Sequence, residues 1–310
     1  MSSLWQRWVY ALKPASWPKL AVPGLLGIAL GFAETRRGPP LGIALALLFT
    51  ILDLVFVVTL NDWGDQEVDR LKRQMFPDGC SKKTIPDGIL PARALLVAGL
   101  TAGTAMVLVA LWAEHALDRP GLGLLALGAA GVFVAYTFPP LALNYRGGGE
   151  LLEMVGVGVL LPLVTAAFVG GQGLSATGRA VLPGLALVCF SSALASGLSD
   201  EQSDRAGNKS TFTTWLGNER VRQLSLAALL AGAGAWTAAA LLSPRFPLLG
   251  LSALIPLGLY GRQAALLSPR AVTNAFAEQG RFKKQLHLAI WGATLALTAA
   301  LVVEGARGEA

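Results

Sequence analysis

The sequence contains few charged residues for its length. Only 14% of its 310 residues are Asp, Glu, Lys or Arg, whereas 54% are hydrophobic. Soluble globular domains usually carry about a quarter charged residues, so this composition excludes an ordinary soluble domain and favours the bilayer as the solvent. The net charge of +6 is therefore interpreted as a feature of membrane topology, and we expect no nucleic-acid partner.

Cysteine and histidine are scarce as well. The two cysteines, Cys80 and Cys189, lack metal-ligand spacing and suit a reduced protein that faces the cytoplasm. Neither of the two histidines, His115 and His287, is a convincing metal ligand or base at its position between or within apolar stretches. The first eighteen residues have no cleavage-type motif of small residues, so we expect no signal peptide.

Long apolar stretches, in contrast, recur along the whole chain. A helix needs about 20 residues to cross about 30 Å of hydrocarbon at 1.5 Å per residue. We predict an all-α, multi-pass membrane protein that forms one domain over residues 1–310 and lies in membrane lipid. Its nine predicted spans are 19–35, 39–60, 92–113, 120–142, 151–171, 180–199, 222–243, 246–266 and 285–304.

The basic residues are distributed unequally between the two sides of the membrane. If the N-terminus is cytoplasmic, 19 of the 25 Lys and Arg residues fall on the cytoplasmic side and 6 on the other. This is the bias of the positive-inside rule. The longest polar segments fall on the same side, at 61–91, 143–150, 200–221 and 267–284. We therefore predict a protein of the cell (inner) membrane whose active site faces the cytoplasm.

A short internal repeat links two of these polar segments. DQEVDR begins at Asp65 after the second predicted span, and DEQSDR begins at Asp200 after the sixth, 135 residues later. Membrane proteins often have a binding site at the interface of such repeats. We predict two four-helix halves, at about 19–142 and 151–266, followed by a ninth helix at 285–304.

Both repeated segments carry acidic residues at helical spacing. Asn61, Asp65 and Asp69 are spaced i, i+4 and i+8, and Asp200 and Asp204 are spaced i and i+4, so each set shares one helical face. Like charges on one face repel, and carboxylates in the membrane zone are costly, which favours a cation between the faces. Mg²⁺ prefers carboxylate, water and phosphate oxygens. These five residues are thus predicted ligands of magnesium diphosphate; the alternative is solvated loop acids neutralised by neighbouring Lys and Arg.

Basic residues follow the acidic segments. Phosphate oxygens could be contacted by several of them: Lys72, Arg73, Lys82, Lys83, Arg146 and Lys209. We assign Lys72, Arg73, Arg146 and Lys209, together with Asn61, to substrate binding, although positive-inside topology explains at least half of the basic residues. Tyr136, just before the Pro139-Pro140 break, could shield a carbocation by cation–π attraction, but interfacial tyrosines are common in membrane proteins.

These motifs resemble those of the UbiA superfamily of intramembrane prenyltransferases. The first motif of that family, NDxxDxxxD, is matched in full by NDWGDQEVD. The second motif, DxxxD followed by Gly and Lys, is matched by DEQSDRAGNKST with Asn208 inserted between Gly207 and Lys209. The early KPASWP and the nine predicted spans extend the resemblance over nearly the whole chain.

The resemblance implies a UbiA-like fold and a mechanism. Two Mg²⁺ ions held by Asn61 and the four aspartates would bind an isoprenyl diphosphate and promote the loss of diphosphate. The implied catalytic residues are Asp65, Asp69, Asp200, Asp204 and Tyr136. An aromatic small molecule would then attack the allylic cation, whose tail would lie in an apolar cavity between helices.

The acceptor is less well defined by these motifs. PPLALNYRGGGE resembles the PPxxLxYxGxGE segment of the MenA-like branch, which prenylates 1,4-dihydroxy-2-naphthoate in quinone biosynthesis, but Gly148 stands where Leu is usual. The loop DRLKRQMFPDGCSKKTIPDG also differs from the shorter loops of that branch. Two other functions stay open: a terpene cyclase of the same superfamily, and a transporter, which a midline repeat also suits.

Overall fold

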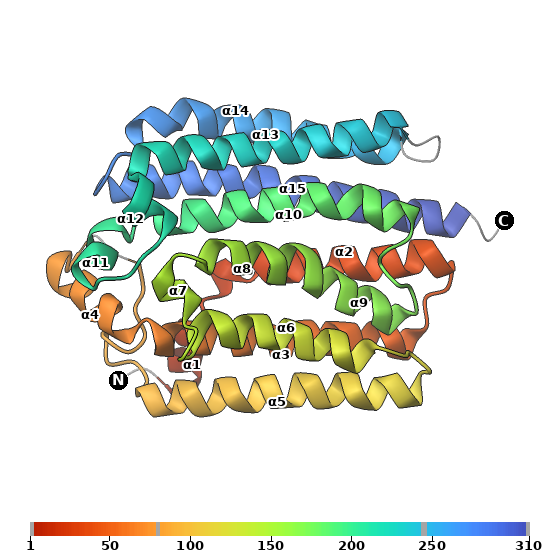
Figure 1. Ribbon diagram of the computed structural model, residues 1–310, viewed down its shortest axis with the longest axis horizontal. Coiled ribbons are helices and arrows are strands. Elements are labelled where there is room, and N and C mark those ends of the chain that lie inside the picture. Colours follow the sequence, from red (N-terminus) through yellow and green to blue (C-terminus); the bar gives the residue numbers. More distant parts are fainter. Residues whose placement is uncertain (1–2, 79–80, 243–246, 308–310) are drawn as a thin grey trace.

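The chain forms a bundle of long helices that lie side by side along one direction (Figure 1). The computed structural model describes residues 3–78, 81–242 and 247–307, with 247–250 described as helix only; Cys80 and the predicted span ends at 243 and 246 lie outside these ranges. Every regular element of the described part is helical: α1 (Leu4–Leu12), η1 (Pro14–Ser16), α2 (Pro18–Thr35), α3 (Pro40–Gly64), α4 (Gln66–Met75), α5 (Ala92–Ala116), α6 (Leu122–Thr137), α7 (Leu143–Arg146), α8 (Gly149–Val155), η2 (Gly156–Leu160), α9 (Leu161–Val169), α10 (Ala176–Gly197), α11 (Glu201–Ala206), α12 (Phe212–Leu216), α13 (Asn218–Leu242), α14 (Pro247–Leu267), η3 (Ser268–Arg270) and α15 (Phe276–Arg307).

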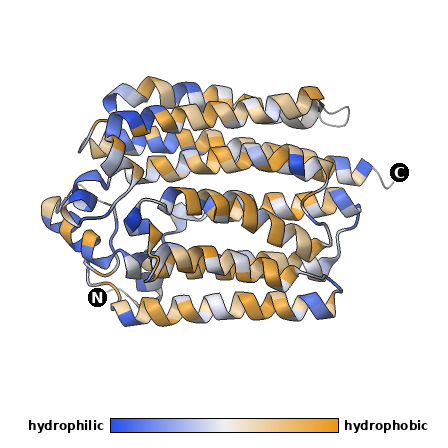
Figure 2. Ribbon diagram, viewed as in Figure 1, coloured by the Kyte–Doolittle hydropathy of each residue, from blue (hydrophilic) through white to orange (hydrophobic). Residues whose placement is uncertain are grey.

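Hydrophobic residues predominate along the long helices (Figure 2), and they include exposed as well as buried positions. Leu124, Leu230 and Ile255, on three different helices, are 75%, 71% and 73% exposed. A soluble protein rarely exposes so much apolar surface together, whereas lipid accepts it. Six helices of the described part are long and apolar enough to cross a membrane. The chain is therefore a multi-pass membrane protein.

The all-α class is confirmed, but the count of nine spans is not. Beyond the six helices, a seventh span is counted within the described residues if α2 and the preceding Leu4–Ser16 segment, bent by 64°, cross together. The predicted span 120–142 is shorter than expected, because α6 has 16 residues and stops at Thr137. Phe138, which precedes Pro139 and Pro140, is extended, because proline disfavours a helical conformation in the residue before it. α14, at the predicted 246–266 span, is not among the six helices.

Two other predicted spans differ in their internal structure. The 151–171 span consists of α8, the π-helical turn η2 and α9, and Leu161 N–H donates to the Gly156 carbonyl. Pro162 has no N–H for an ordinary α-helical bond to Gly158, which explains the shifted ladder. The last span is part of the 32-residue α15, which begins at Phe276, so much of the predicted loop 267–284 is helical.

Polar segments gather at one end of the bundle. α4, α7, α11 and α12 lie together at the left end of Figure 1, on the same side as the N-terminus. Much of the blue of Figure 2 lies at this same end of the bundle. α4, which follows α3, packs against α11, which follows α10. The two segments that repeat in the sequence therefore meet in space.

Close helix contacts hold this arrangement in place, and Gly27 makes one of them. α2 packs against both α9 and α15. A Cβ atom added at Gly27 would lie 2.0 Å from Thr165 Oγ1 and 2.3 Å from the Pro162 carbonyl oxygen. Small residues permit such close approach between membrane helices.

We expect Gly27→Ala to lower the free energy of unfolding by about 1–3 kcal/mol, the usual cost of overpacking, because backbone atoms of α9 cannot move aside cheaply. The matched control is Gly234→Ala in α13, where an added Cβ meets nothing within 4 Å; it should be neutral or slightly stabilising, since Ala favours helix more than Gly. Thermal unfolding in detergent measures both variants. Equal unfolding temperatures would contradict the close contact.

Candidate active site

Each acidic segment lies where a long helix gives way to a short one. α3 ends and α4 begins on either side of Asp65, so the continuous helical face predicted from Asn61 to Asp69 is interrupted there. The i+4 spacing persists, because Asp65 N–H donates to the Asn61 carbonyl and Asp69 N–H to the Asp65 carbonyl, both at 2.9 Å. The second segment has the same form: Asp200 precedes α11, and Asp204 N–H donates to the Asp200 carbonyl at 2.8 Å.

Lysines connect the two acidic segments in a reciprocal manner. Lys72 of α4 donates to Asp200 Oδ1, which belongs to the second segment. Lys209, which follows α11, donates to Asp65 Oδ1 of the first segment at 2.8 Å. Both lysines are buried, with 1% and 7% of the residue exposed. The acids from the two repeats therefore form one cluster, and each repeat supplies a cation to the other.

Lys83, from the loop after α4, is the third cation of this cluster. Its ammonium donates to Asp69 Oδ1 and lies 4.0 Å from Asp200 Oδ1. Burial alone would raise the pKa of Asp200, but the charges of Lys72 and Lys83 outweigh burial and hold this pKa well below its usual range. Asp200 is thus kept ionised by its neighbours.

Two oxygen-bearing groups of the cluster have no protein donor in the described part of the chain. Asn61 Oδ1 is buried without a hydrogen-bond partner. Asp204 is only 3% exposed, and no ion pair joins its carboxylate to a described residue. Burial raises the pKa of Asp204 to about 8. A buried polar group without a partner is costly, so these two groups are suited to an external cation.

No three Asp, Glu, His or Cys side chains of the described residues converge tightly enough to hold a metal ion by themselves. Ammonium groups account for this, since Lys72, Lys83 and Lys209 lie among the acids. Each ammonium is paired with one carboxylate: Lys72 with Asp200, Lys83 with Asp69 and Lys209 with Asp65.

The short helix α7 approaches the cluster from a third side. Asn144 Nδ2 donates to Asp65 Oδ1 at 3.1 Å, and Tyr145 Oη donates to the Gly64 carbonyl at 3.1 Å. Lys209 Nζ lies 5.0 Å from the centre of the Tyr145 ring. Asn144 was not identified from the sequence, although it stands inside the PPLALNYRGGGE segment that was.

Two of the predicted substrate-binding residues make their contacts away from the acids of the cluster. Arg73 pairs with Asp87, with its Nε 2.8 Å from Asp87 Oδ1. Arg146 is exposed, and its backbone bridges to Ser210. Lys72 and Lys209 do reach the cluster, as described above.

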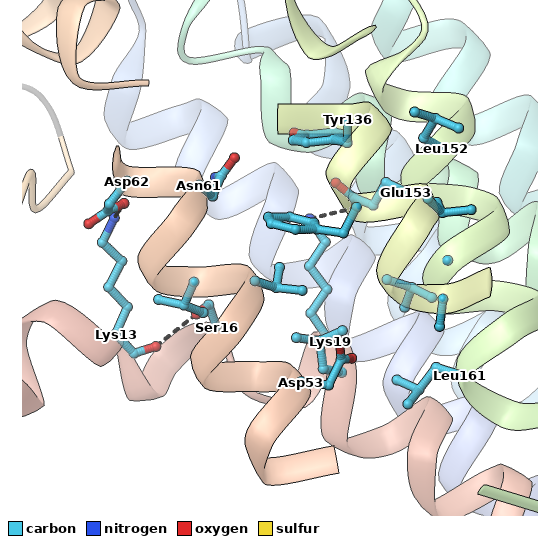
Figure 3. Close-up of a pocket in the computed structure, with 18 of the residues that line it drawn as sticks. Lys13, Ser16, Lys19, Asp53, Asn61, Asp62, Tyr136, Leu152, Glu153 and Leu161 are labelled. Carbon is cyan, nitrogen blue, oxygen red and sulfur yellow. Dashed lines mark hydrogen bonds and ion pairs between the residues drawn. The ribbon is translucent and has the colours of Figure 1, made fainter. Parts of the chain in front are cut away.

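A cavity of about 220 Å³ lies beside Asn61 and Tyr136, between α2, α3, α6 and the α8–η2 segment. Its walls are mainly apolar, and Asn61, Asp62 and Tyr136 lie at one end (Figure 3). The Tyr136 ring stacks on Phe133, with ring centroids 5.7 Å apart and planes at 15°. This arrangement can accept a molecule with a polar head near the acidic cluster and an apolar body between the helices.

The N-terminal segment supplies two cations to this cavity that the sequence did not predict. Lys13 pairs with Asp62, and Lys19 Nζ lies 2.6 Å from Glu153 Oε1. A further carboxylate, Asp53, lines the cavity deeper inside α3. The KPASWP segment contains Lys13 and is followed directly by Lys19, but no spacing in the sequence connects these lysines to acids more than forty residues away.

Asp87 anchors the loop that carries Lys83. Its carboxylate accepts hydrogen bonds from Tyr10 Oη, from Arg73 and from the Lys83 N–H at 3.0 Å. Burial acts to raise the pKa of Asp87, but these hydrogen bonds outweigh it and hold this pKa below its usual value. The Asp87 carboxylate thereby connects α1, α4 and the loop that carries Lys83.

Comparison with known proteins places this site in context. The sequence model of the UbiA prenyltransferase family matches residues 20–283. Chlorophyll synthase from Oryza sativa subsp. japonica is 28% identical over 148 residues, which are 47% of this chain and 38% of the relative. The match thus spans less than half of the relative's own length.

Solved structures share the fold at low identity. A UbiA homolog from Archaeoglobus fulgidus bound to GPP and Mg²⁺ has a TM-score of 0.68 at 15% identity, covering 94% of this chain and 99% of that one. The same homolog bound to DMAPP and Mg²⁺ has a TM-score of 0.67 at 16% identity, covering 96% and 99%. The fold class expected from the sequence is therefore confirmed.

We expect Asp87→Asn to increase the rate of proteolysis within residues 76–91 at neutral pH and to lower stability by about 1–3 kcal/mol, the range for hydrogen bonds to charged groups. Because the folded-state pKa of Asp87 is depressed, its contribution is present above the unfolded pKa of about 4 and is lost as pH falls through the folded pKa. Wild type and variant should therefore converge in strongly acidic buffer. Asp78→Asn, an exposed position of the same loop, is the control and should behave as wild type.

Proposed function

Because the chain belongs to the UbiA prenyltransferase family, we propose that it transfers an isoprenyl group from an isoprenyl diphosphate to an aromatic acceptor within the membrane. Two observations support this most directly: the two aspartate motifs meet through Lys72 and Lys209, and Asn61 of the first motif also lines an apolar cavity. An isoprenyl diphosphate has the matching shape, with a charged head and an apolar tail. The A. fulgidus homolog of the same fold is bound to GPP and Mg²⁺.

For the cofactor we propose Mg²⁺, two ions as the family resemblance implies, held by Asn61, Asp65, Asp69, Asp200 and Asp204. The unpartnered Asn61 Oδ1 and the unpaired Asp204 carboxylate support this assignment, since Mg²⁺ prefers oxygen ligands. When bound, Mg²⁺ supplies charge that neutralises the diphosphate and stabilises it as a leaving group.

The lysines of the cluster have a second task in this proposal. Lys72 and Lys209 are preorganised around the acids, so their ammonium groups can donate to diphosphate oxygens as negative charge develops on them. Lys83 is placed to act with them. Arg73 is committed to Asp87 and Arg146 is exposed, so we propose for these two residues at most a role in drawing the anionic head toward the site.

Aromatic rings form the wall where a carbocation would develop. The stacked Tyr136 and Phe133 line the cavity next to Asn61. A cation over such a ring is stabilised by about 0.5–2 kcal/mol. We propose that Tyr136 shields the allylic cation until the acceptor attacks it, and that the acceptor is 1,4-dihydroxy-2-naphthoate or a related quinone precursor, as the PPLALNYRGGGE segment suggests.

Topology and internal symmetry complete the proposal. We propose that the acidic end of the bundle faces the cytoplasm from the inner membrane, a topology supported by the excess of Lys and Arg in its segments. The two acidic segments also share their helix-end position and their i+4 backbone bond. This likeness supports one domain built of two repeated halves and a final helix.

A direct assay separates the possible reactions. Membranes containing the protein, Mg²⁺ and isoprenyl diphosphates of several lengths are incubated with and without aromatic acceptors, and the products are identified by mass spectrometry. We expect prenylated acceptor together with released diphosphate, and loss of both when a chelator removes Mg²⁺. Cyclic hydrocarbon formed without acceptor would favour a terpene cyclase, and flux of substrate without diphosphate release would favour a transporter.

Asp204→Asn tests the metal site most cleanly, because Asp204 makes no ion pair that the substitution would break. We expect diphosphate release to fall by about 100-fold or more, with an unfolding temperature equal to or above that of wild type, since a buried acid without a paired cation is replaced by a neutral amide. Mg²⁺ with an isoprenyl diphosphate should stabilise wild type but not the variant in thermal unfolding.

The control for this experiment is Glu67→Gln. Glu67 lies in the same motif, but its side chain is 72% exposed and pairs with the exposed side chain of Arg70. It should retain wild-type turnover. Wild-type activity in Asp204→Asn would contradict the proposed metal site.

A further inference from the structure

Three carboxylates line the cavity beside the acidic cluster: Asp53, Asp62 and Glu153. Prenyl transfer to an aromatic carbon or hydroxyl group requires that a proton leave the acceptor, so one of them is a candidate to receive it. The contacts of the three acids distinguish them.

Asp62 and Asp53 are unsuited to this task for different reasons. Both oxygens of Asp62 are occupied, Oδ1 by Lys13 and Oδ2 by Thr84 at 2.6 Å. Asp53 lies eight residues before Asn61 on the same helix, which places it about 12 Å further into the bundle at 1.5 Å per residue. The proton is lost beside the diphosphate end, so Asp53 is too distant from it.

Glu153 has one carboxylate oxygen without a partner in the described structure, and it lines the cavity near Tyr136 and Asn61. Its Oε1 lies 2.6 Å from Lys19 Nζ, and its side chain keeps 19% of its surface exposed. Oε2 makes no hydrogen bond within the described structure and is not among the enclosed atoms. In Figure 3, Glu153 extends from its helix toward the side of the cavity where Tyr136 and Asn61 lie.

Lys19 orients this carboxylate from α2. Its ammonium also donates to Ser196 Oγ at 3.4 Å, and Ser196 Oγ donates in turn to the Ser192 carbonyl at 2.9 Å. The chain of contacts runs from α10 through α2 to α8. A carboxylate held at one oxygen by a fixed ammonium and open at the other has the arrangement expected of an oriented general base.

We propose that Glu153 is the general base of prenyl transfer, with Lys19 as its positioning residue; this inference rests on the proposed function. The C1–O bond of the isoprenyl diphosphate breaks, and its electron pair leaves with the diphosphate. An electron pair of the acceptor forms the new bond to C1. The acceptor proton passes to Glu153 Oε2. The electron pair of a broken C–H bond returns to the aromatic system, and that of a broken O–H bond stays on the oxygen. Glu153 then releases its proton to water.

The test is Glu153→Gln, an isosteric change that removes the proton acceptor. We expect the rate of product formation to fall by about 10²–10⁴-fold, the usual contribution of a general base. Mg²⁺-dependent diphosphate release in the absence of acceptor should stay within about twofold of wild type, because ionisation precedes proton loss. With an acceptor that carries deuterium at the attacked ring carbon, the variant should show a primary isotope effect. Glu153→Asp should recover part of the rate, and Glu67→Gln should retain all of it.

A second pair of variants allows for misfolding. If an unpaired Lys19 lowers the yield of folded Glu153→Gln, the double variant Lys19→Gln/Glu153→Gln is compared with Lys19→Gln alone, and the double should form product at least about 100-fold more slowly. Product formation by Glu153→Gln within threefold of wild type overturns the inference, as does an equal loss of product formation and diphosphate release. A wild type that releases no diphosphate from any donor contradicts the proposed function itself, and this inference with it.

Discussion

Buried like charges need cations close to them, and this requirement ties the two halves of the protein together. Four aspartates meet at one end of an otherwise apolar bundle, where the membrane zone makes unpaired charge costly. Lys72 and Lys209 provide these cations, and each of the two neutralises an acid in the motif of the other half. The contact between α4 and α11 is therefore as much electrostatic as steric. The cluster can form only when both halves are folded.

The same principle continues into the cavity. The N-terminal segment turns back against the bundle and brings Lys13 and Lys19 to the cavity carboxylates Asp62 and Glu153. The polar end of the cavity is thus surrounded by matched pairs, while its walls are apolar and aromatic. Such a site favours ligands that have an anionic head at one end and an apolar chain along the rest of their length. This polarity supports a diphosphate-bearing lipid as the ligand.

The family's fold is shared across low sequence identity, with TM-scores of 0.67 and 0.68 at 16% and 15% identity. Bilayer physics explains how this is possible. Many apolar residues satisfy a lipid-facing or helix-packing position equally well, provided that small residues such as Gly27 remain where helices approach closely. In the charged cluster, every carboxylate removed or added changes the charge balance with its lysines.

The sequence by itself determined what depends on local geometry. The apolar stretches predicted helices, because a backbone in lipid must satisfy its own hydrogen bonds, and the i, i+4 spacing of Asp65 and Asp69 determined a shared local face even though the helix breaks at Asp65. The Lys and Arg bias likewise needs only the order of the segments. Only the tertiary structure decided which lysine meets which acid, that Arg73 turns to Asp87, and that Lys19 holds Glu153. The members of these pairs are separated by 14 to 144 residues, so their meeting depends on how whole helices pack, and no local periodicity encodes that packing.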